Sequence, residues 1–160
     1  MKRKNPEELT KKEALLKMAS YCAYQERCHS EVHQKLMDLG IRGVEVQEII
    51  DWLEEEKFLN ELRFAKAFAG GKFRVKSWGK IKISQALMQK KVKDEYIHIG
   101  LEEIDAEDYF QTLHRLMLTK NGQLGEELEP FKRKQKLFAY AASKGYEPDV
   151  IWAVIKELDV

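Results

Sequence analysis

The stretch Val32–Leu53, VHQKLMDLGIRGVEVQEIIDWL, decides the fold of this chain. Its apolar residues recur three and four positions apart on both sides of Gly40, which is the spacing of two amphipathic helices joined by a turn. Glycine accepts the left-handed backbone that ends many helices, so the first helix should stop at Gly40. Ser30 is a suitable N-cap for that helix. The second helix should bury one face, formed by Val46, Ile49, Ile50 and Leu53.

The same pattern occurs twice more, displaced by 51 residues and then by a further 54. Leu36, Ile41 and Val46 correspond to Leu87, Val92 and Ile97, and then to Ala141, Tyr146 and Ile151. Only Gly100 and Ala141 depart from large apolar character in this register. Three gapless copies of one helix-turn-helix pattern indicate tandem structural repeats.

A further helical segment precedes each copy, so every repeat should hold three helices. The predicted leading helices are Lys11–Arg27, Leu62–Lys72 and Ala106–Thr119, the first opened by the capping-box pair Thr10 and Glu13. No segment alternates polar and apolar residues for long enough to form a sheet. We therefore predict an all-α fold of three tandem three-helix repeat units forming an elongated body, because small units must share apolar surface with their neighbours.

The predicted organisation is an N-terminal tail at 1–9, a first unit at 10–61, a second, basic unit at 62–105 and a third unit at 106–160. The connection between the first two units contains neither glycine nor proline, so these units should be in contact. Residues 120–130 hold two glycines and a proline and are predicted to form a loop. Pro148 suits the first turn of the last helix. The register places these residues in the core: Leu36, Ile50, Leu87, Leu101 and Ile155.

The formal charge of +1, from 28 basic and 27 acidic residues, hides a strong segregation along the chain. Residues 62–93 contain ten Lys or Arg and no acid. The flanking segments 44–62 and 94–110 contain seven acidic residues each. This distribution favours a patterned interaction surface over a uniformly solvated one.

Several classes of protein are excluded by what the sequence lacks. It has no apolar run long enough to cross a membrane and no secretory signal pattern at its start, so we expect a cytoplasmic protein. Cys22 and Cys28 are spaced to face opposite sides of a helix and should be free thiols. No phosphate-binding loop or dinucleotide fingerprint occurs, and we predict no catalytic residue and no cofactor.

The segment His29–His33 invites a metal-site hypothesis, because two histidines stand four residues apart. The carboxylate between them is at the wrong offset for the HExxH pattern, and Cys22 and Cys28 lack the close pairing of a structural zinc site. We therefore predict no metal site, and expect His29 to precede a helix.

The basic segment supplies the candidate interaction residues: Arg63, Lys66, Lys72, Arg74, Lys76, Lys80, Lys82, Lys90 and Lys91. Lys72, Arg74 and Lys76 should lie on the connection before the helix that carries Ile83 and Leu87, and the last four should surround that helix. Such a cluster would attract phosphates without reading base sequence. An acidic protein surface would attract it equally well, and a merely solubilising role is a third interpretation because the whole chain is rich in lysine.

Residues Arg63–Val92, RFAKAFAGGKFRVKSWGKIKISQALMQKKV, resemble the central signature of the RecX family. The shared pattern is Arg-aromatic-Ala, a second aromatic, a basic cluster, Gly-x-x-Lys-Ile and a characteristic helix end. The three-unit layout extends the resemblance over roughly residues 10–158. The chain departs from the family pattern at Asn60–Leu62, which replaces an acidic run, at Gly70-Gly71, and at Lys90–Val92, where the helix end lacks its glycine.

The resemblance implies a bacterial, non-enzymatic modulator of the RecA recombinase that has a place in DNA recombination, DNA repair and the SOS response. Members of the family are usually inhibitors that lodge along the RecA–DNA filament and can contact DNA. The expected partners are therefore the RecA filament and single- or double-stranded DNA, and the expected state is a monomer. The alternative is a freestanding helical nucleic-acid-binding protein that acts without RecA.

Overall fold

The computed structural model describes residues 9–160, which form nine α-helices and no strand. The helices are α1 (Lys11–Tyr24), α2 (His29–Asp38), α3 (Val44–Glu55), α4 (Glu61–Lys76), α5 (Lys80–Gln89), α6 (Asp94–Glu102), α7 (Ala106–Gln123), α8 (Pro130–Ser143) and α9 (Pro148–Leu158). The all-α prediction is confirmed. The expected tail at 1–9 falls almost wholly outside the described residues. None of the described helices is long and apolar enough to cross a membrane.

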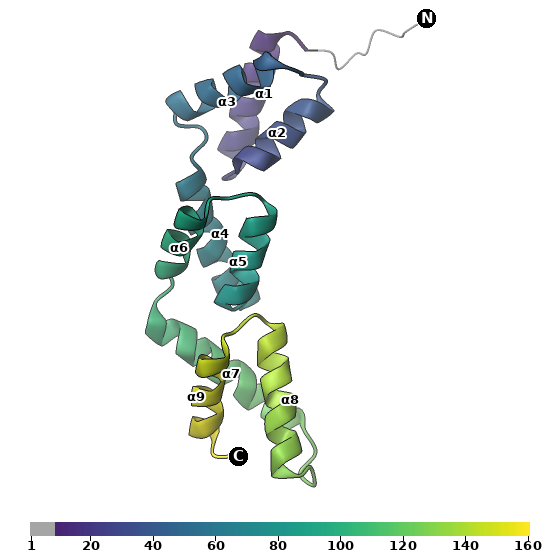
Figure 1. Cartoon of the computed structure of the whole chain (residues 1–160), viewed down its shortest axis with the longest axis vertical. Helices are drawn as coiled ribbons and strands as arrows, with labels where there is room; N and C mark the ends of the chain where they lie inside the picture. The colour runs from purple at the N-terminus through teal and green to yellow at the C-terminus, as the bar shows by residue number, and fades with distance from the viewer. Residues whose placement is uncertain (1–8) are drawn as a thin grey trace, which may run out of the picture.

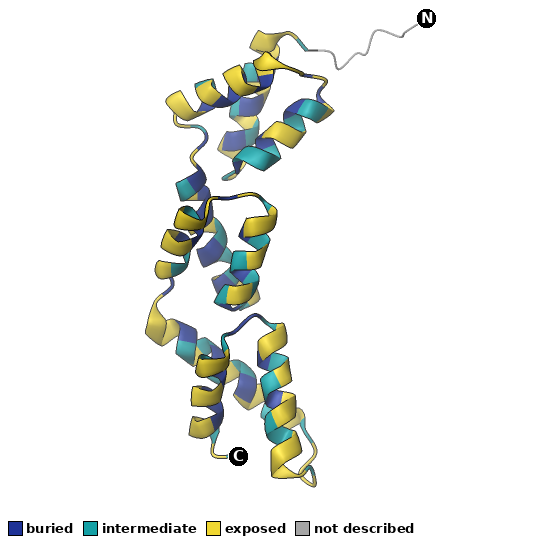
Figure 2. Ribbon diagram, viewed as in Figure 1, coloured by how far each residue is buried: buried dark blue, intermediate teal, exposed yellow. Residues whose placement is uncertain are grey.

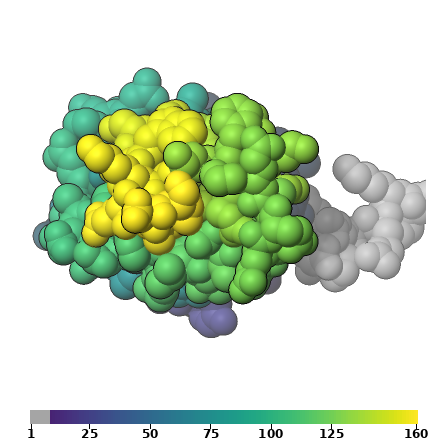
Figure 3. Space-filling view, turned by 90° about the horizontal axis from the view of Figure 1, so that it is seen from below, coloured from purple at the N-terminus to yellow at the C-terminus, as the bar shows by residue number. Residues whose placement is uncertain are grey.

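Three groups of three helices follow one another along the long axis of the body (Figure 1). We call α1–α3 the first group, α4–α6 the second and α7–α9 the third. The middle helices α2, α5 and α8 lie on the same side of the body. Viewed from below, α8 and α9 adjoin at the C-terminal end (Figure 3), where the rings of Phe138 and Trp152 stack with centroids 5.0 Å apart.

Each leading helix begins with a side-chain cap. Thr10 accepts a hydrogen bond from the Glu13 N–H at 3.1 Å and completes the predicted capping box, while Asn60 and Asp105 cap α4 and α7. The prediction that Ser30 caps α2 was wrong. The N-cap is Cys28, two residues earlier, so His29 is the first residue of the helix and does not precede it as expected. The Ser30 hydroxyl donates to the carbonyl of Lys90 at 2.7 Å.

The middle helix of every group ends in the same way. Gly40, Lys91 and Gly145 occupy equivalent repeat positions and have φ values of 85°, 62° and 93°. In each case the next N–H donates back to a carbonyl five residues earlier, as in the pair Ile41 and Leu36 at 3.0 Å. The predicted stop at Gly40 is confirmed, and Lys91 adopts a left-handed backbone where the other two repeats have glycine.

Two hydrophobic cores run through the body (Figure 2). The first group encloses its own core, which includes Met18, Leu36 and Leu53. The second core continues without interruption from α4 to α9 and also takes in Cys28. Leu36, Ile50, Leu87 and Ile155 are buried as predicted, whereas Leu101 is only partly buried at the edge of the second core.

The glycine at position 100 interrupts the apolar register because α6 crosses α4 closely there. Gly100 is buried, and a Cβ added to it would lie 2.9 Å from the carbonyl oxygen of Ala65. No side chain larger than hydrogen fits at this crossing without moving backbone.

Three predicted helix ends differ from the structure. α1 ends at Tyr24 and not near Arg27, and α7 continues to Gln123 into the predicted loop. α4 passes through Gly70-Gly71 and ends at Lys76, because Gly70 and Phe73 are buried and packing outweighs the low helix propensity of glycine. Pro148 opens α9 as predicted.

Candidate cationic interaction surface

The α4–α5 strip is a run of alternating cations and aromatic rings on the second group, formed by Phe68, Lys72, Trp78, Lys82 and Lys90. The Lys72 ammonium lies 5.4 Å from the ring centroid of Phe68 and 5.0 Å from that of Trp78. Lys82 reaches the Trp78 ring at 4.8 Å, and Lys90 reaches the Phe68 ring at 5.9 Å. Residues far apart in the basic segment are thus gathered on two rings.

Local geometry builds this strip. Phe68 and Lys72 are four residues apart on α4, so they share a face of the helix. Ser77 ends α4 with a left-handed backbone, φ 56°, which turns the chain so that Trp78 lies between α4 and the start of α5. Since α4 extends to Lys76, the candidates Lys72, Arg74 and Lys76 belong to a helix and not to a connection, contrary to prediction.

The charges of Lys72 and Lys82 are not neutralised by neighbours. Within residues 9–160, neither ammonium has a carboxylate oxygen within 4.0 Å. A cation over an aromatic ring at such a site gains about 0.5–1 kcal/mol, which orders the side chain while leaving its charge intact. Both ammonium groups are therefore positioned to meet an anionic partner.

Three of the predicted site residues form ion pairs with carboxylates of the chain itself. Arg63 pairs with Glu26 at 2.6 Å, and Lys90 pairs with Glu31 at 3.1 Å, so both join the first group to the second. Lys66 pairs with Glu103 at 3.6 Å within the second group. These side chains hold the helices in register in addition to any external contact.

The remaining four candidates lie in different surroundings. Arg74 and Lys76 are exposed on the last turn of α4. The Lys80 ammonium lies 4.9 Å from the ring centroid of Tyr109 on α7, at the junction with the third group. Lys91 is exposed and lines a pocket beside α2, at the junction with the first group. The structure thus brings Lys72, Lys82 and Lys90 together and disperses the others.

Sequence reasoning missed a second cation–aromatic cluster on the third group. The ammonium groups of Lys120 and Lys144 lie 5.3 and 5.9 Å from the ring centroid of Tyr140. The cluster adjoins the start of α5, because the Lys144 carbonyl accepts the Gly79 N–H at 2.7 Å. Residues 130–146 contain five Lys or Arg and no acid, a signal that could have indicated this cluster.

Tyrosine hydroxyls hold the second and third groups together. The Tyr109 hydroxyl accepts the backbone N–H of Lys80 at 2.8 Å and donates to the carboxylate of Glu147, while the Tyr146 hydroxyl donates to the Ser77 carbonyl at 2.8 Å. Burial raises the pKa of both tyrosines, so both hydroxyls stay protonated. This junction fixes the turn that carries Trp78.

The histidines and cysteines of the first group form no metal centre. Cys22 and Cys28 are buried free thiols, as expected, and burial raises the pKa of Cys22 to about 11. Across residues 9–160, no group of three or more His, Cys, Asp or Glu side chains is placed to hold a metal ion.

The fold and this surface define a class of protein: an elongated array of three-helix repeats whose middle repeat presents cations on aromatic rings. Comparison with known families assigns it further. Residues 60–101 match the second three-helix domain of RecX, and residues 107–155 match the third three-helix domain of RecX. The chain belongs to the RecX family.

Individual relatives agree with this assignment. The regulatory protein RecX of Clostridium perfringens strain 13 is 31% identical over 133 residues, which cover 82% of this chain and 62% of that protein. The regulatory protein RecX of Lactobacillus johnsonii is 31% identical over 147 residues, covering 92% of this chain and 54% of that protein. The chain therefore spans little more than half the length of these curated relatives.

Solved structures show the same fold. The crystal structure of RecX from Lactobacillus salivarius superposes with a TM-score of 0.86 at 21% sequence identity, covering 93% of this chain and 96% of that one. A second crystal structure, of a regulatory protein RecX, gives a TM-score of 0.82 at 20% identity, covering 91% of this chain and 73% of that one. At these identities the likeness concerns the fold.

Proposed function

We propose that this protein is a non-enzymatic regulator of the RecA recombinase, acting as an inhibitor that binds along the RecA–DNA filament in DNA recombination and repair. Membership of the RecX family supports the RecA partner. The α4–α5 strip is the observation that carries the mode of action, because two of its three cations, Lys72 and Lys82, have no carboxylate oxygen within 4.0 Å among residues 9–160 and would be available to an outside partner.

The proposed contact is made by the second unit, residues 62–105, of the three units at 10–61, 62–105 and 106–160. Lys72, Lys76 and Lys82 would meet phosphates or an acidic groove of the filament, with Arg74 and Lys80 beside them. Phosphate contacts release counterions and give affinity without base specificity. An elongated body with its middle helices on one side suits a partner that is itself extended.

The test is RecA ATPase activity and strand exchange on DNA already saturated with RecA, with the protein titrated well below one copy per RecA subunit. We expect inhibition at these substoichiometric amounts, since one regulator bound in a filament acts on many subunits. Inhibition that occurs only when bare DNA is available would instead support the freestanding nucleic-acid-binding protein and contradict the proposal.

A further inference from the structure

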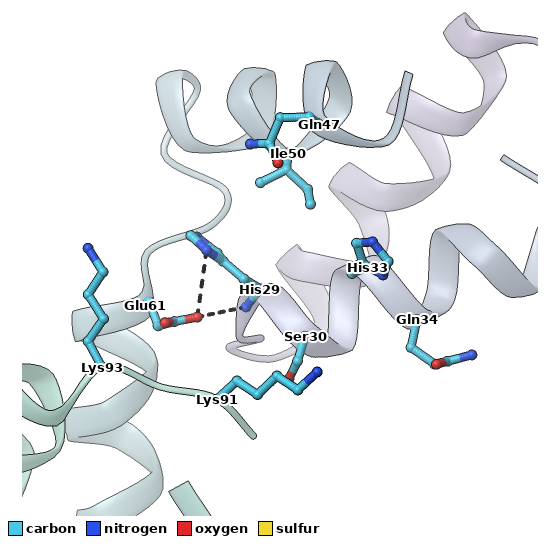
Figure 4. Close-up of a pocket in the computed structure, with 9 residues that line it drawn as sticks. All are labelled: His29, Ser30, His33, Gln34, Gln47, Ile50, Glu61, Lys91 and Lys93. Atoms are coloured by element: carbon cyan, nitrogen blue, oxygen red, sulfur yellow. Dashed lines mark hydrogen bonds and ion pairs between the residues drawn. The ribbon is translucent and has the colours of Figure 1, made fainter. Parts of the chain in front are cut away.

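A pocket of about 590 Å³ lies at the junction of the first and second groups (Figure 4). His29 and His33 of α2 flank it below Gln47 and Ile50 of α3. The turn between α5 and α6 contributes Lys91 and Lys93 from the other group. Its volume falls in the range of small-molecule sites, about 300–1,000 Å³.

The pocket has an excess of positive charge. Its one acidic lining residue is Glu61. The Glu61 carboxylate accepts a hydrogen bond from the backbone N–H of His29 at 2.9 Å and lies 3.8 Å from the ring Nδ1 of His29, so it already has partners within the chain. Lys91 and Lys93 have no carboxylate oxygen within 4.0 Å among residues 9–160. The Lys91 side chain runs below Ser30 and His33, whereas that of Lys93 extends to the other side of Glu61, where its ammonium lies 5.7 Å from the Tyr96 ring centroid (Figure 4). An anion beside His33 would therefore meet the free ammonium group of Lys91.

The backbone at Lys91 is left-handed, a conformation that Lys57, Ser77 and Asp159 also adopt outside the pocket. Its φ is 62°, and the equivalent residues of the other repeats are Gly40 and Gly145. A non-glycine residue in this conformation costs about 1 kcal/mol. The third repeat makes the same turn with Gly145, which adopts this conformation without strain, so the helix end itself does not require a lysine.

We propose that this pocket binds a phosphate ester. The ammonium group of Lys91 would neutralise the phosphate, and the side chain of His33 beside it would supply a further hydrogen bond. Ile50 offers an apolar wall for the rest of the ligand. The ester could be a free nucleotide or a backbone phosphate of nucleic acid, since both present the same group.

A ligand here would also bridge two groups that share little apolar surface. The first group has its own core, and polar pairs such as Arg63 with Glu26 and Lys90 with Glu31 join it to the second. Binding should therefore stiffen this junction more than the junction between the second and third groups, which share one core.

The chain provides a closely matched pair of variants for the test. Lys91→Gly removes the charge from the pocket and relieves the left-handed strain, so the variant should bind less while folding more stably. Lys57→Gly removes the same charge and relieves the same strain, since Lys57 has a φ of 65°, but Lys57 is exposed outside the pocket. Isothermal titration calorimetry at fixed ionic strength would use pyrophosphate, dAMP and an oligo(dT) of about 15 nucleotides as probes.

We expect saturable binding of at least one probe. Lys91→Gly should weaken the affinity about tenfold or more, as expected for loss of a charge-assisted contact, and Lys57→Gly should keep the affinity within about twofold of wild type. Such binding of dAMP identifies a free nucleotide as the source, and binding of oligo(dT) alone identifies a nucleic-acid backbone. Binding of pyrophosphate alone would show a site for inorganic anions and would overturn the phosphate-ester proposal. Equal affinities in the three proteins, equal losses in both variants, or no saturable binding of any probe would overturn the proposal.

Discussion

Replacing Gly100 by alanine should destabilise the protein, although glycine-to-alanine changes inside helices normally stabilise by about 1 kcal/mol. Gly100 lies within α6, and the added Cβ would stand 2.9 Å from the carbonyl oxygen and 3.0 Å from the carbonyl carbon of Ala65. These are backbone atoms of α4, so the contact can be relieved only by moving the two helices apart.

The magnitude follows from two opposing effects. The gain in helix propensity is about 1 kcal/mol, and overpacking a tight site costs about 1–3 kcal/mol. Since the obstructing atoms are backbone, we expect the cost to win by about 1 kcal/mol. Gly71→Ala is the control, because Gly71 lies within α4 with no atom within 4 Å of an added Cβ, and it should stabilise by about 0.5–1 kcal/mol.

Urea and thermal unfolding followed by circular dichroism would measure both variants. The difference of about 2 kcal/mol corresponds to about 4–8 °C in Tm for a chain of this length. If Gly100→Ala were as stable as the wild type, or moved in the same direction as Gly71→Ala, the close crossing of α4 and α6 would be refuted.

Three further predictions concern packing, the junction and the thiols. Leu87→Ala should lower the free energy of unfolding by about 2–5 kcal/mol and Leu101→Ala by clearly less, because Leu87 is fully buried and Leu101 is not; equal losses in urea titrations would contradict the repeat register. Tyr109→Phe should cost about 1–3 kcal/mol in the same titrations, because it strips the Glu147 carboxylate of a donor, and an unchanged midpoint would refute this role for the hydroxyl. With its pKa raised to about 11, the Cys22 thiol should be only about 0.1% thiolate at pH 8, so it should react slowly with a disulfide reagent until the protein unfolds. The labelling rate of the native protein should rise about tenfold per pH unit below pH 11. Rapid labelling of the native protein at pH 8 would contradict this prediction and show the thiol to be accessible.

The apolar register was sufficient to predict the repeats and most of the core. Leu36, Leu87 and Ile155 are buried because period and position both follow from helix geometry. The predicted helix Leu62–Lys72 already spanned Gly70-Gly71 but ended short of Lys76, and only the buried Phe73 shows why the helix continues. The local signal was outweighed by tertiary packing.

The candidate surface was predictable in composition but not in arrangement. The ten Lys or Arg residues between positions 62 and 93 identified the second group. Sequence alone could not show that Lys90 pairs with Glu31 from another group. Nor could it show that Lys120 of α7 joins Lys144 on the ring of Tyr140, because Tyr140 and Lys144 belong to α8 and its C-cap, on another helix. The sequence showed that the helix end at Lys90–Val92 lacks the glycine of the family pattern, but the left-handed backbone of Lys91 is visible only in the structure.

The most direct test of the central claim is RecA-driven strand exchange with two charge-reversal variants, on DNA saturated with RecA. The first variant changes Lys72, Lys76 and Lys82 of the second group to glutamate. It omits Lys90, because reversing that charge would oppose Glu31 and disturb the junction. The control makes the same change at three exposed lysines of the first group, Lys12, Lys17 and Lys57, and alters net charge identically.

Both variants should fold, since Lys76 and the three control lysines are exposed, Lys72 and Lys82 are only partly buried, and surface substitutions usually change stability by about 0.5 kcal/mol each. The second-group variant is expected to lose inhibition, and its logarithmic salt dependence of duplex binding should flatten by about 0.9 for each lost phosphate contact. The control should inhibit strand exchange nearly as well as the wild type. Equal loss of inhibition in both variants would show that only overall charge matters, and full inhibition by the second-group variant would show that the α4–α5 strip does not contact the filament.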